Sequence, residues 1–230
     1  AHHRALFECS QDALITMDPP KWNFTFGNPA TMAMFRTKDV QEFVAYGLFA
    51  LSPERQPDGR ASAEKAQEFI TTAMRDGSVS FEWTHKRTDG EEFPAAVLLT
   101  RMEYAGKIVL QATVRDMTGQ KRAEDELRRL ANIIEASPDF VGYFSKTDGR
   151  VLYINKAGRQ MVGFSPQENV VGMRFQDGLS PWTNKMHEDV ILPAIHQDGV
   201  WKGQCSLRHR DGHEIPVSMA DMLHHTAAVT

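Results

Sequence analysis

Residues 87–94 read RTDGEEFP, and residues 209–216 read HRDGHEIP, 122 positions later. Asp-Gly between two strands is a strong signal for a hairpin turn, because both residues tolerate a positive φ angle. Apolar residues alternate with polar ones around each turn, over residues 79–104 and 201–224. Each stretch therefore predicts two antiparallel strands joined by a tight turn.

The repeat extends toward the N-terminus. Ser10-Gln11-Asp12 returns as Ser137-Pro138-Asp139, and Asn28 returns as Asn155, both 127 positions later. This period is far above the roughly 20–50 residues of solenoid repeats, so it indicates two whole domains in series. We predict three segments: a first domain at residues 1–117, a helical linker at residues 118–135 and a second domain at residues 136–230.

The order of elements in each copy predicts an α+β fold. In the first copy, residues 13–17 and 22–26 read as strands, helical spacing prevails from Pro29 to residue 75, and a further strand at residues 107–114 follows the hairpin. Antiparallel hairpins grouped around a block of helices are typical of α+β domains. The second copy repeats this order but lacks a counterpart of the last strand.

The bulk composition is that of a soluble globular chain. The sequence has 230 residues, 41% of them hydrophobic, and a net charge of −4. No apolar run approaches the ~20 residues needed to cross a bilayer, so we expect a cytoplasmic protein without membrane insertion. The acidic balance argues against nucleic-acid binding. Cys9 and Cys205 have no counterparts across the repeat, so we expect no disulfide and no metal site.

Further motifs follow the predicted strands. Asn-Pro-Ala or Asn-Lys-Ala comes after the second strand of each copy, at residues 28–30 and 155–157, and Val114-Arg115-Asp116-Met117-Thr118 closes the first copy before a charged helical segment. Together with the hairpins and the order of elements, these motifs resemble tandem PAS sensor domains of bacterial signalling proteins, over almost the whole chain. The resemblance implies a five-stranded antiparallel sheet in each domain, with helices on one face that enclose a small cavity.

The second copy departs from this family in one respect. The resemblance places the last strand in the interior of the sheet, so a domain without it would have unpaired backbone and an incomplete core. We expect the native protein to continue past Thr230, or a neighbouring chain to fill the gap.

The resemblance also indicates which residues surround each cavity. Aromatic and methionine side chains there can line a site for a planar or apolar ligand, although core packing is the simpler explanation. The Asn after each second strand can bind a ligand, although capping of the following helix explains it more simply. The ligand-pocket candidates, with a Trp on each third strand, are Asn28, Met32, Phe35, Trp83, Asn155, Met161, Phe164 and Trp201.

The cofactor remains unknown from the sequence. Haem-binding members of the family take an axial histidine from the long helix beside the cavity, where this chain has His187 and His196. An ordinary surface or core histidine is the simpler interpretation of each. The covalent flavin chemistry of light-oxygen-voltage domains needs a cysteine in one particular segment, and the analogous stretches, residues 47–51 and 172–176, contain none. We expect no cofactor, with haem or a non-covalently held flavin as the alternatives.

The linker carries an apolar stripe at Leu127, Leu130 and Ile134. Spacings of three and four residues place the stripe on one helix face, which suits a short coiled coil or a helix docked on its own domain. Residues 93–104 are apolar on both faces, as in a strand that a partner subunit covers.

The resemblance implies a non-catalytic sensory module, and no phosphate loop, metalloprotease motif or nucleophile elbow occurs in the chain. We expect it to bind a small ligand or partner as a homodimer, and to relay the change through the linker helix to an output domain in cis, a histidine kinase. The alternatives are a ligand-free dimerisation scaffold and the sensor region of a diguanylate cyclase.

Overall fold

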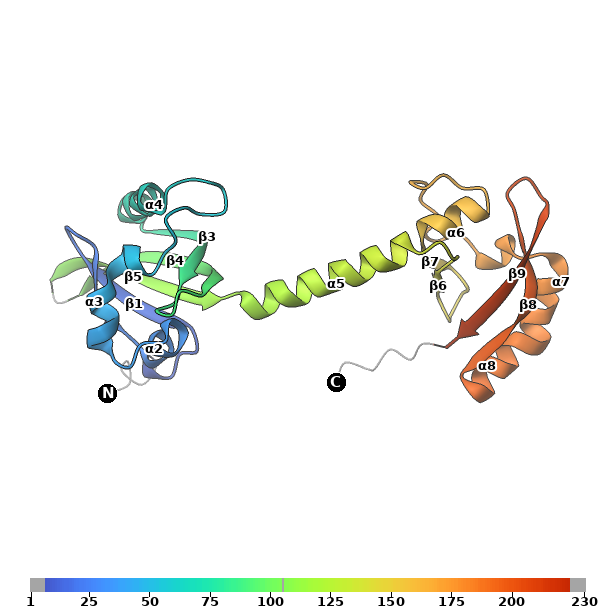
Figure 1. Ribbon diagram of the computed structural model, residues 1–230, viewed down its shortest axis with the longest axis horizontal. Helices are drawn as coiled ribbons and strands as arrows, with labels where there is room; N and C mark the ends of the chain where they lie inside the picture. The colour runs from blue at the N-terminus through green and yellow to red at the C-terminus, as the bar shows by residue number, and fades with distance from the viewer. Residues whose placement is uncertain (1–6, 105, 224–230) are drawn as a thin grey trace. The chain divides into compact units, whose positions relative to one another are not determined.

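The computed structural model describes residues 7–104 and 106–223. The chain forms two compact units, residues 1–125 and 126–230, and each has the predicted α+β character (Figure 1). Among the described residues, no helix is both long enough and apolar enough to cross a membrane.

The first unit contains a five-stranded antiparallel sheet in the order β2-β1-β5-β4-β3, so the last strand of the unit lies at its centre. The predicted turn at Asp89-Gly90 joins β3 to β4, and Gly90 has a φ of 90°, which a residue with a side chain rarely adopts. The strands are β1 (Ala13–Asp18), β2 (Asn23–Gly27), β3 (Ser78–Lys86), β4 (Glu92–Tyr104) and β5 (Lys107–Asp116).

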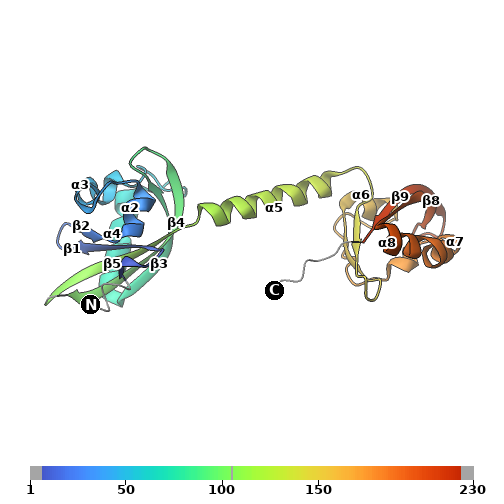
Figure 2. The ribbon, with the colours of Figure 1, turned by 90° about the horizontal axis from the view of Figure 1, so that it is seen from below.

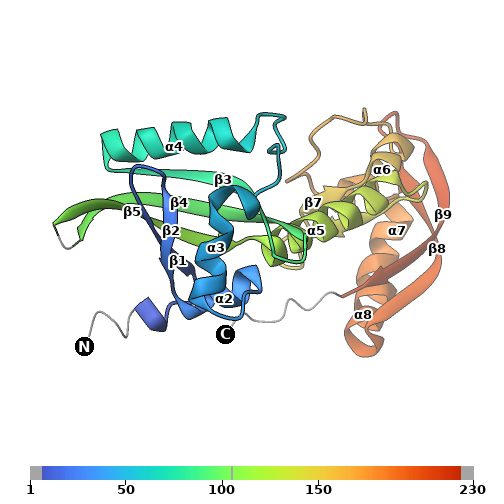
Figure 3. The same ribbon diagram turned by 60° about the vertical axis from the view of Figure 1, so that its left-hand side comes forward.

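Three helices cover one face of this sheet (Figure 3), namely α2 (Pro29–Phe35), α3 (Val40–Ala50) and α4 (Ser62–Asp76). The first two begin where the sequence provides a cap, because Asn28 and Asp39 each accept a hydrogen bond from the backbone N–H three residues later. Along α4, buried residues recur at helical spacing, so one stripe of the helix packs on the sheet.

Alternation along β4 divides its side chains between the two faces of the sheet. Val97 and Leu99 are each 5% exposed and belong to the core, whereas Leu98 on the other face is 42% exposed. The sequence predicts a strand covered on both faces. Within the described residues, the helices cover the inner face and Leu98 remains exposed on the outer one.

The second unit contains two separate antiparallel pairs of strands, β6 (Gly142–Phe144) with β7 (Val151–Ile154), and β8 (Val200–Arg208) with β9 (Glu214–Met222). In the first unit, β5 joins the corresponding pairs by bonding to both β1 and β4. The described part of the second unit has no such strand, so its sheet is split. The five-stranded sheet expected in each domain is therefore present in the first unit and fragmented in the second. Residues 224–230, where the chain would approach the missing strand, lie outside the described residues.

The predicted long helix over residues 182–197 is present, with one irregularity. The α-helices α7 (Pro181–Met186) and α8 (Leu192–Asp198) flank a π-helical turn, η2 (His187–Ile191), and α8 contacts β8 (Figure 2). Two shorter helices precede it, α6 (Lys156–Met161) and the 3-10 helix η1 (Phe175–Gly178).

Helix α5 (Thr118–Ala136) follows β5 directly. None of its residues is buried in the described chain, and the apolar stripe is well exposed, at 68% for Leu127, 49% for Leu130 and 41% for Ile134. The stripe therefore does not pack into the core of its own chain.

Candidate functional site

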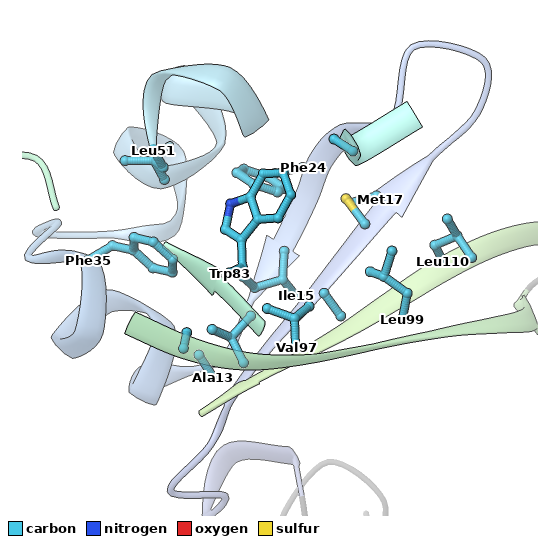
Figure 4. Close-up of a cluster of buried hydrophobic side chains, with 14 of the residues drawn as sticks. Ala13, Ile15, Met17, Phe24, Phe35, Leu51, Trp83, Val97, Leu99 and Leu110 are labelled. Carbon is cyan, nitrogen blue, oxygen red and sulfur yellow. The ribbon is translucent and has the colours of Figure 1, made fainter. Parts of the chain in front are cut away.

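The first unit has an apolar cavity of about 40 Å³ between the sheet and the helices. Ile15, Val97 and Ala112 border it from the strands, and Ala66 and Ile70 border it from α4. Figure 4 shows the side chains of Trp83, Phe24, Met17 and Leu99, which also line the cavity, gathered around the same space. The cavity therefore lies inside the domain core, between the two layers of the fold.

Trp83 and His85 reach the cavity from alternate positions of β3. Trp83 is 5% exposed, and its indole Nε1 donates a hydrogen bond to Ser52 Oγ at 3.1 Å. The polar end of this side chain is thereby satisfied by the segment that follows α3. The rest of the indole belongs to the core.

His85 is the other polar residue of the cavity wall, at 6% exposure. Its Nδ1 lies 3.2 Å from the backbone oxygen of Leu51, which can only accept, so Nδ1 carries the proton of the neutral ring. Burial lowers the pKa of His85 to about 4, against the weaker opposing effect of the Leu51 hydrogen bond. Within the described residues, Nε2 has no hydrogen-bond partner.

The two predicted asparagines cap helices and tie them to strands. Asn28 is fully buried, and its Oδ1 accepts from the N–H groups of Leu14 and Thr31, both at 3.0 Å. Asn155 is also fully buried, and its Oδ1 accepts from the N–H groups of Val141 and Gly158 at 3.0 and 2.9 Å. Both amide groups donate to backbone oxygens as well. The side chains thus serve backbone groups, as the capping interpretation predicts.

Of the other first-domain candidates, Trp83 borders the cavity, whereas Met32 and Phe35 pack elsewhere around the core. Phe35 is fully buried and meets the ring of His85 edge-on at 5.2 Å. Met32 is partly buried, and its sulfur accepts a hydrogen bond from Thr37 Oγ1 at 3.2 Å.

Trp201 does not correspond to Trp83 in register. Each hairpin has nine paired positions, which begin at Ser78 in the first domain and at Val200 in the second. The counterpart of Trp83 is therefore Cys205, and the counterpart of His85 is Leu207. The Trp201 ring instead lies over Gly203, where an added Cβ would come within 2.4 Å of it. Met161 and Phe164 are partly buried around a small core of Val162, Leu179 and Leu207.

The two haem-ligand candidates lie in different surroundings. His187 is buried in the π-helical turn, edge-on to Phe175, with Nε2 4.0 Å from Asp221, and burial lowers the pKa of His187. His196 is exposed. The first-domain cavity, at about 40 Å³, is too small for haem or flavin, because a cavity that holds benzene already has a volume of about 150 Å³.

His209, Asp211 and His213 form the one group of three possible metal ligands among the described residues. They lie at the tip of the second hairpin, where the ligand atoms are within 4.8 Å of one another. The backbone N–H of His213 and then the two imidazoles lower the pKa of Asp211 to about 2. His213 Nδ1 lies 2.6 Å from Asp211 Oδ1, and the backbone N–H of Asp211 donates to His209 Nδ1 at 3.2 Å.

Arg87 connects the cavity domain to the beginning of α5. Its guanidinium donates to the backbone oxygen of Met34 at the end of α2, bonds Asp116 Oδ2 at 2.7 Å and lies 4.0 Å from the Phe93 ring. Asp116 Oδ1 accepts from the N–H of Thr118, the first residue of α5, at 2.8 Å. Burial opposes ionisation of Asp116, but the hydrogen bonds from Thr118 and Arg87 outweigh it and lower the pKa of this carboxyl.

The last turn of α5 is bonded to the second domain. Glu135 accepts hydrogen bonds from the Tyr153 hydroxyl and, at 2.5 Å, from Arg159. The Tyr153 bond is the main cause of the lowered pKa of Glu135, and burial together with Glu135 raises the pKa of Tyr153 to about 12. Asn155 Nδ2 donates to the Ile134 backbone oxygen at 3.1 Å. The sequence did not predict these contacts or the hydrogen bond of His85, because each of them joins residues that are far apart in the chain.

Comparison with protein-family models gives two matches, one per unit. Residues 11–119 match a PAS domain model and residues 128–224 match a PAS fold model. The chain contains two PAS domains in tandem. PAS domains are sensory and signalling modules, and within the described residues the sheet of the second one is split where that of the first is continuous.

Solved PAS structures resemble this chain over about half its length. A PAS domain from a two-component sensor histidine kinase is 16% identical, with 50% of this chain and 93% of that chain covered and a TM-score of 0.41. A PAS domain of an HTR-like protein from Haloarcula marismortui is 23% identical, covering 50% and 88%, with a TM-score of 0.42. A domain of a sensory box sensor histidine kinase/response regulator from Geobacter sulfurreducens is 25% identical, covering 49% and 90%, with a TM-score of 0.36. No curated protein matches the chain.

Proposed function

We propose that this tandem PAS region is a sensory module in which the first domain binds a small molecule and helix α5 carries the resulting change onward. The cavity of the first domain carries this proposal, because it lies between the two layers of the fold and is bordered by β5. A molecule held there contacts the strand that leads directly into α5.

The hydrogen bonds at the two ends of α5 support the relay. Arg87 joins the end of α2 to Asp116, and Asp116 caps α5, so a shift of α2 against the sheet changes the geometry at the start of α5. At the other end, Glu135 is bonded to Tyr153 and Arg159 of the second domain. A ligand acts through such a path only if it favours one of two packings of these elements.

The output of the module lies outside this chain in our proposal. A histidine kinase in the same polypeptide is the favoured output, a diguanylate cyclase is the alternative, and the cytoplasm is the expected compartment. The proposed module performs no catalysis itself and operates as a homodimer.

A ligand-free dimerisation scaffold is the second candidate function. The exposed apolar stripe of α5 favours it, together with Leu98 on the outer face of β4. Both features would be covered in a dimer, and neither requires a ligand.

The relay is tested in the full-length protein with Leu127→Pro, which breaks α5, and with Leu127→Ala as the matched control, which preserves the helix. We expect the proline variant to lose regulation of the output activity by the signal, and the alanine variant to retain it. Normal regulation in the proline variant would contradict the proposed relay.

A further inference from the structure

The tips of the two long hairpins share one backbone conformation. Residues 87–91 form the turn between β3 and β4, and residues 209–213 form the turn between β8 and β9. In each turn the N–H of the first residue donates to the backbone oxygen of the fifth at 2.8 Å. The third residue of each turn is an aspartate, so Asp211 is the counterpart of Asp89.

Both turns are also bonded to equivalent points of their domains. The N–H of the second turn residue donates to the backbone oxygen of Phe35 at 3.2 Å in the first domain, and to that of Val162 at 3.0 Å in the second. The next residue in the chain is Arg36 in one case and Gly163 in the other, and both have a positive φ, of 62° and 86°. Gly163 is therefore the counterpart of Arg36.

The first domain places a cation at its hairpin tip. The guanidinium of Arg36 bonds the carboxylates of Asp89 and Glu91, the second at 2.5 Å. Gly163 has no side chain, and among the described residues no arginine or lysine forms an ion pair with Asp211. The second hairpin therefore retains the aspartate of the first but lacks the cation that pairs with it.

Two imidazoles face Asp211 instead. Nδ1 of His213 and Nδ1 of His209 lie 2.6 and 2.9 Å from the same atom, Asp211 Oδ1. The two rings are stacked with their centroids 4.4 Å apart, so both nitrogens approach the carboxylate from neighbouring directions. The side chains of Asp211 and His213 are 60% and 58% exposed, so an ion reaches them directly from solvent.

The bonding of His209 indicates that a cation belongs beside this carboxylate. Its Nδ1 accepts a hydrogen bond from the backbone N–H of Asp211 at 3.2 Å, so this nitrogen carries a lone pair and no proton. Its neighbour at 2.9 Å, Asp211 Oδ1, is also an acceptor. Two acceptors at this distance repel each other, and a cation bound to both removes the repulsion.

The spacing of the three ligand atoms suits a zinc ion. They lie within 4.8 Å of one another, whereas ligand atoms about 2.0–2.2 Å from a tetrahedral zinc ion are roughly 3.3 Å apart. Small rotations of exposed side chains cover this difference. The ion would replace the long hydrogen bond to His209 Nδ1 and the close contact between His213 Nδ1 and the carboxylate.

The set of donors selects the kind of metal. Two imidazole nitrogens and one carboxylate oxygen suit zinc, whereas magnesium and calcium prefer oxygen ligands throughout. Three protein ligands leave the fourth position of the ion to water. The expectation of no metal site was drawn from the two cysteines, and this cluster contains neither of them.

We propose that the second PAS domain binds a zinc ion at the tip of its hairpin, through Nδ1 of His209, Nδ1 of His213 and a carboxylate oxygen of Asp211. The ion supplies the positive charge that Arg36 supplies in the first domain, and it joins the two strands where the hairpin turns. This site lies outside the first-domain cavity and does not depend on the sensory function proposed for that cavity.

The experiment uses the full chain, labelled with ¹⁵N-histidine, and titrates it with zinc chloride and separately with magnesium chloride while the imidazole nitrogen resonances are recorded. We expect zinc to move the Nδ1 resonances of His209 and His213 together, with one midpoint for both. Magnesium should leave both resonances unchanged, because it does not replace oxygen ligands with imidazoles.

His213→Gln removes one ligand, and His196→Gln makes the same change at an exposed histidine on α8. The two variants contain equal numbers of histidines, so zinc held elsewhere on the chain contributes equally to both. We expect His213→Gln to shift the zinc midpoint of His209 by about tenfold or more, and His196→Gln to leave it unchanged. The backbone spectrum of each variant shows whether the fold is retained.

Two results would overturn the proposal. One is a zinc titration of the unmodified chain in which other histidines respond and the Nδ1 atoms of His209 and His213 do not. The other is an equal response to magnesium and zinc, which would show attraction of any divalent cation to the Asp211 carboxylate rather than coordination by imidazole.

Discussion

His85 illustrates what the sequence reveals about a single residue and what it leaves open. Alternation along β3 places it on the same inward face as Trp83, so its burial is predictable from the strand pattern. Its hydrogen bond is not predictable, because Nδ1 bonds to the backbone oxygen of Leu51, which lies 34 residues away in the chain. The capping role of Asn28 and Asn155 was predictable, since the helix that each one caps follows it directly.

We expect His85→Leu to make the first domain less sensitive to acid. The pKa of His85 falls from 6.5 to about 4 on folding, so the unfolded chain binds the proton more strongly and folding is favoured at higher pH. The contribution of neutral His85 to the free energy of unfolding is fully present above pH 6.5, and it is lost as the pH falls toward 4.

Urea unfolding of the two proteins at pH 7 and at pH 4 measures this effect. The leucine variant should gain stability relative to the unmodified chain by up to about 3 kcal/mol over that interval. A difference between the two proteins that stays constant with pH would contradict the buried, neutral state of His85.

At the scale of elements, hydrophobic periodicity predicted the strands, the helices and both hairpins because these depend on local sequence. The register of the strands was harder to predict. Trp83 and Trp201 are on equivalent strands, but the paired positions show that Cys205 is the counterpart of Trp83. The second sheet is fragmented because the described residues of this domain include no strand equivalent to β5, which would bond to both β6 and β9.

We expect the second domain to unfold before the first, because its two strand pairs are not joined and its buried core is smaller. Cys205 reports on this domain, since it is 3% exposed and burial raises the pKa of its thiol. In a Cys9→Ser variant, labelling of Cys205 should accelerate at lower urea than the loss of first-domain structure. Exposed Cys9 in a Cys205→Ser variant is the control, with fast labelling at all urea concentrations. Labelling of Cys205 only after the first domain unfolds would contradict this order.

The exposed stripe of α5 predicts self-association through the helix. Leu130→Glu places a charge on the stripe and should shift the chain toward monomer, because burial of an unpaired carboxylate in a helix pair is unfavourable. Asn132→Glu, at an exposed position of α5 outside the stripe, makes the same change in charge and is the matched control. Light scattering over a range of concentrations measures the effect. An unmodified chain that stays monomeric at every concentration would exclude dimerisation by this helix.

At the scale of the whole molecule, the long repeat was sufficient to predict two domains, because the Ser-x-Asp, Asn and Asp-Gly motifs recur in the same order in both copies. The contacts that tie α5 to each domain were not predictable. Arg87 meets Asp116 across 29 positions, and Glu135 meets Arg159 across 24, and only the folded chain brings these charges together. These contacts turn a linker recognised from its composition into a candidate path between the domains.

The central claim is that a change inside the first-domain cavity is felt in α5, and hydrogen exchange of the α5 amides tests it most directly. Ala112→Val adds two carbons to the cavity wall on β5 and imitates an occupant, while Ala96→Val makes the same change on the outer face of β4. We predict that Ala112→Val changes the exchange rates of residues 118–136 by about twofold or more, and that Ala96→Val leaves them as they are. Altered exchange around the cavity, with α5 the same in all three proteins, would contradict the account.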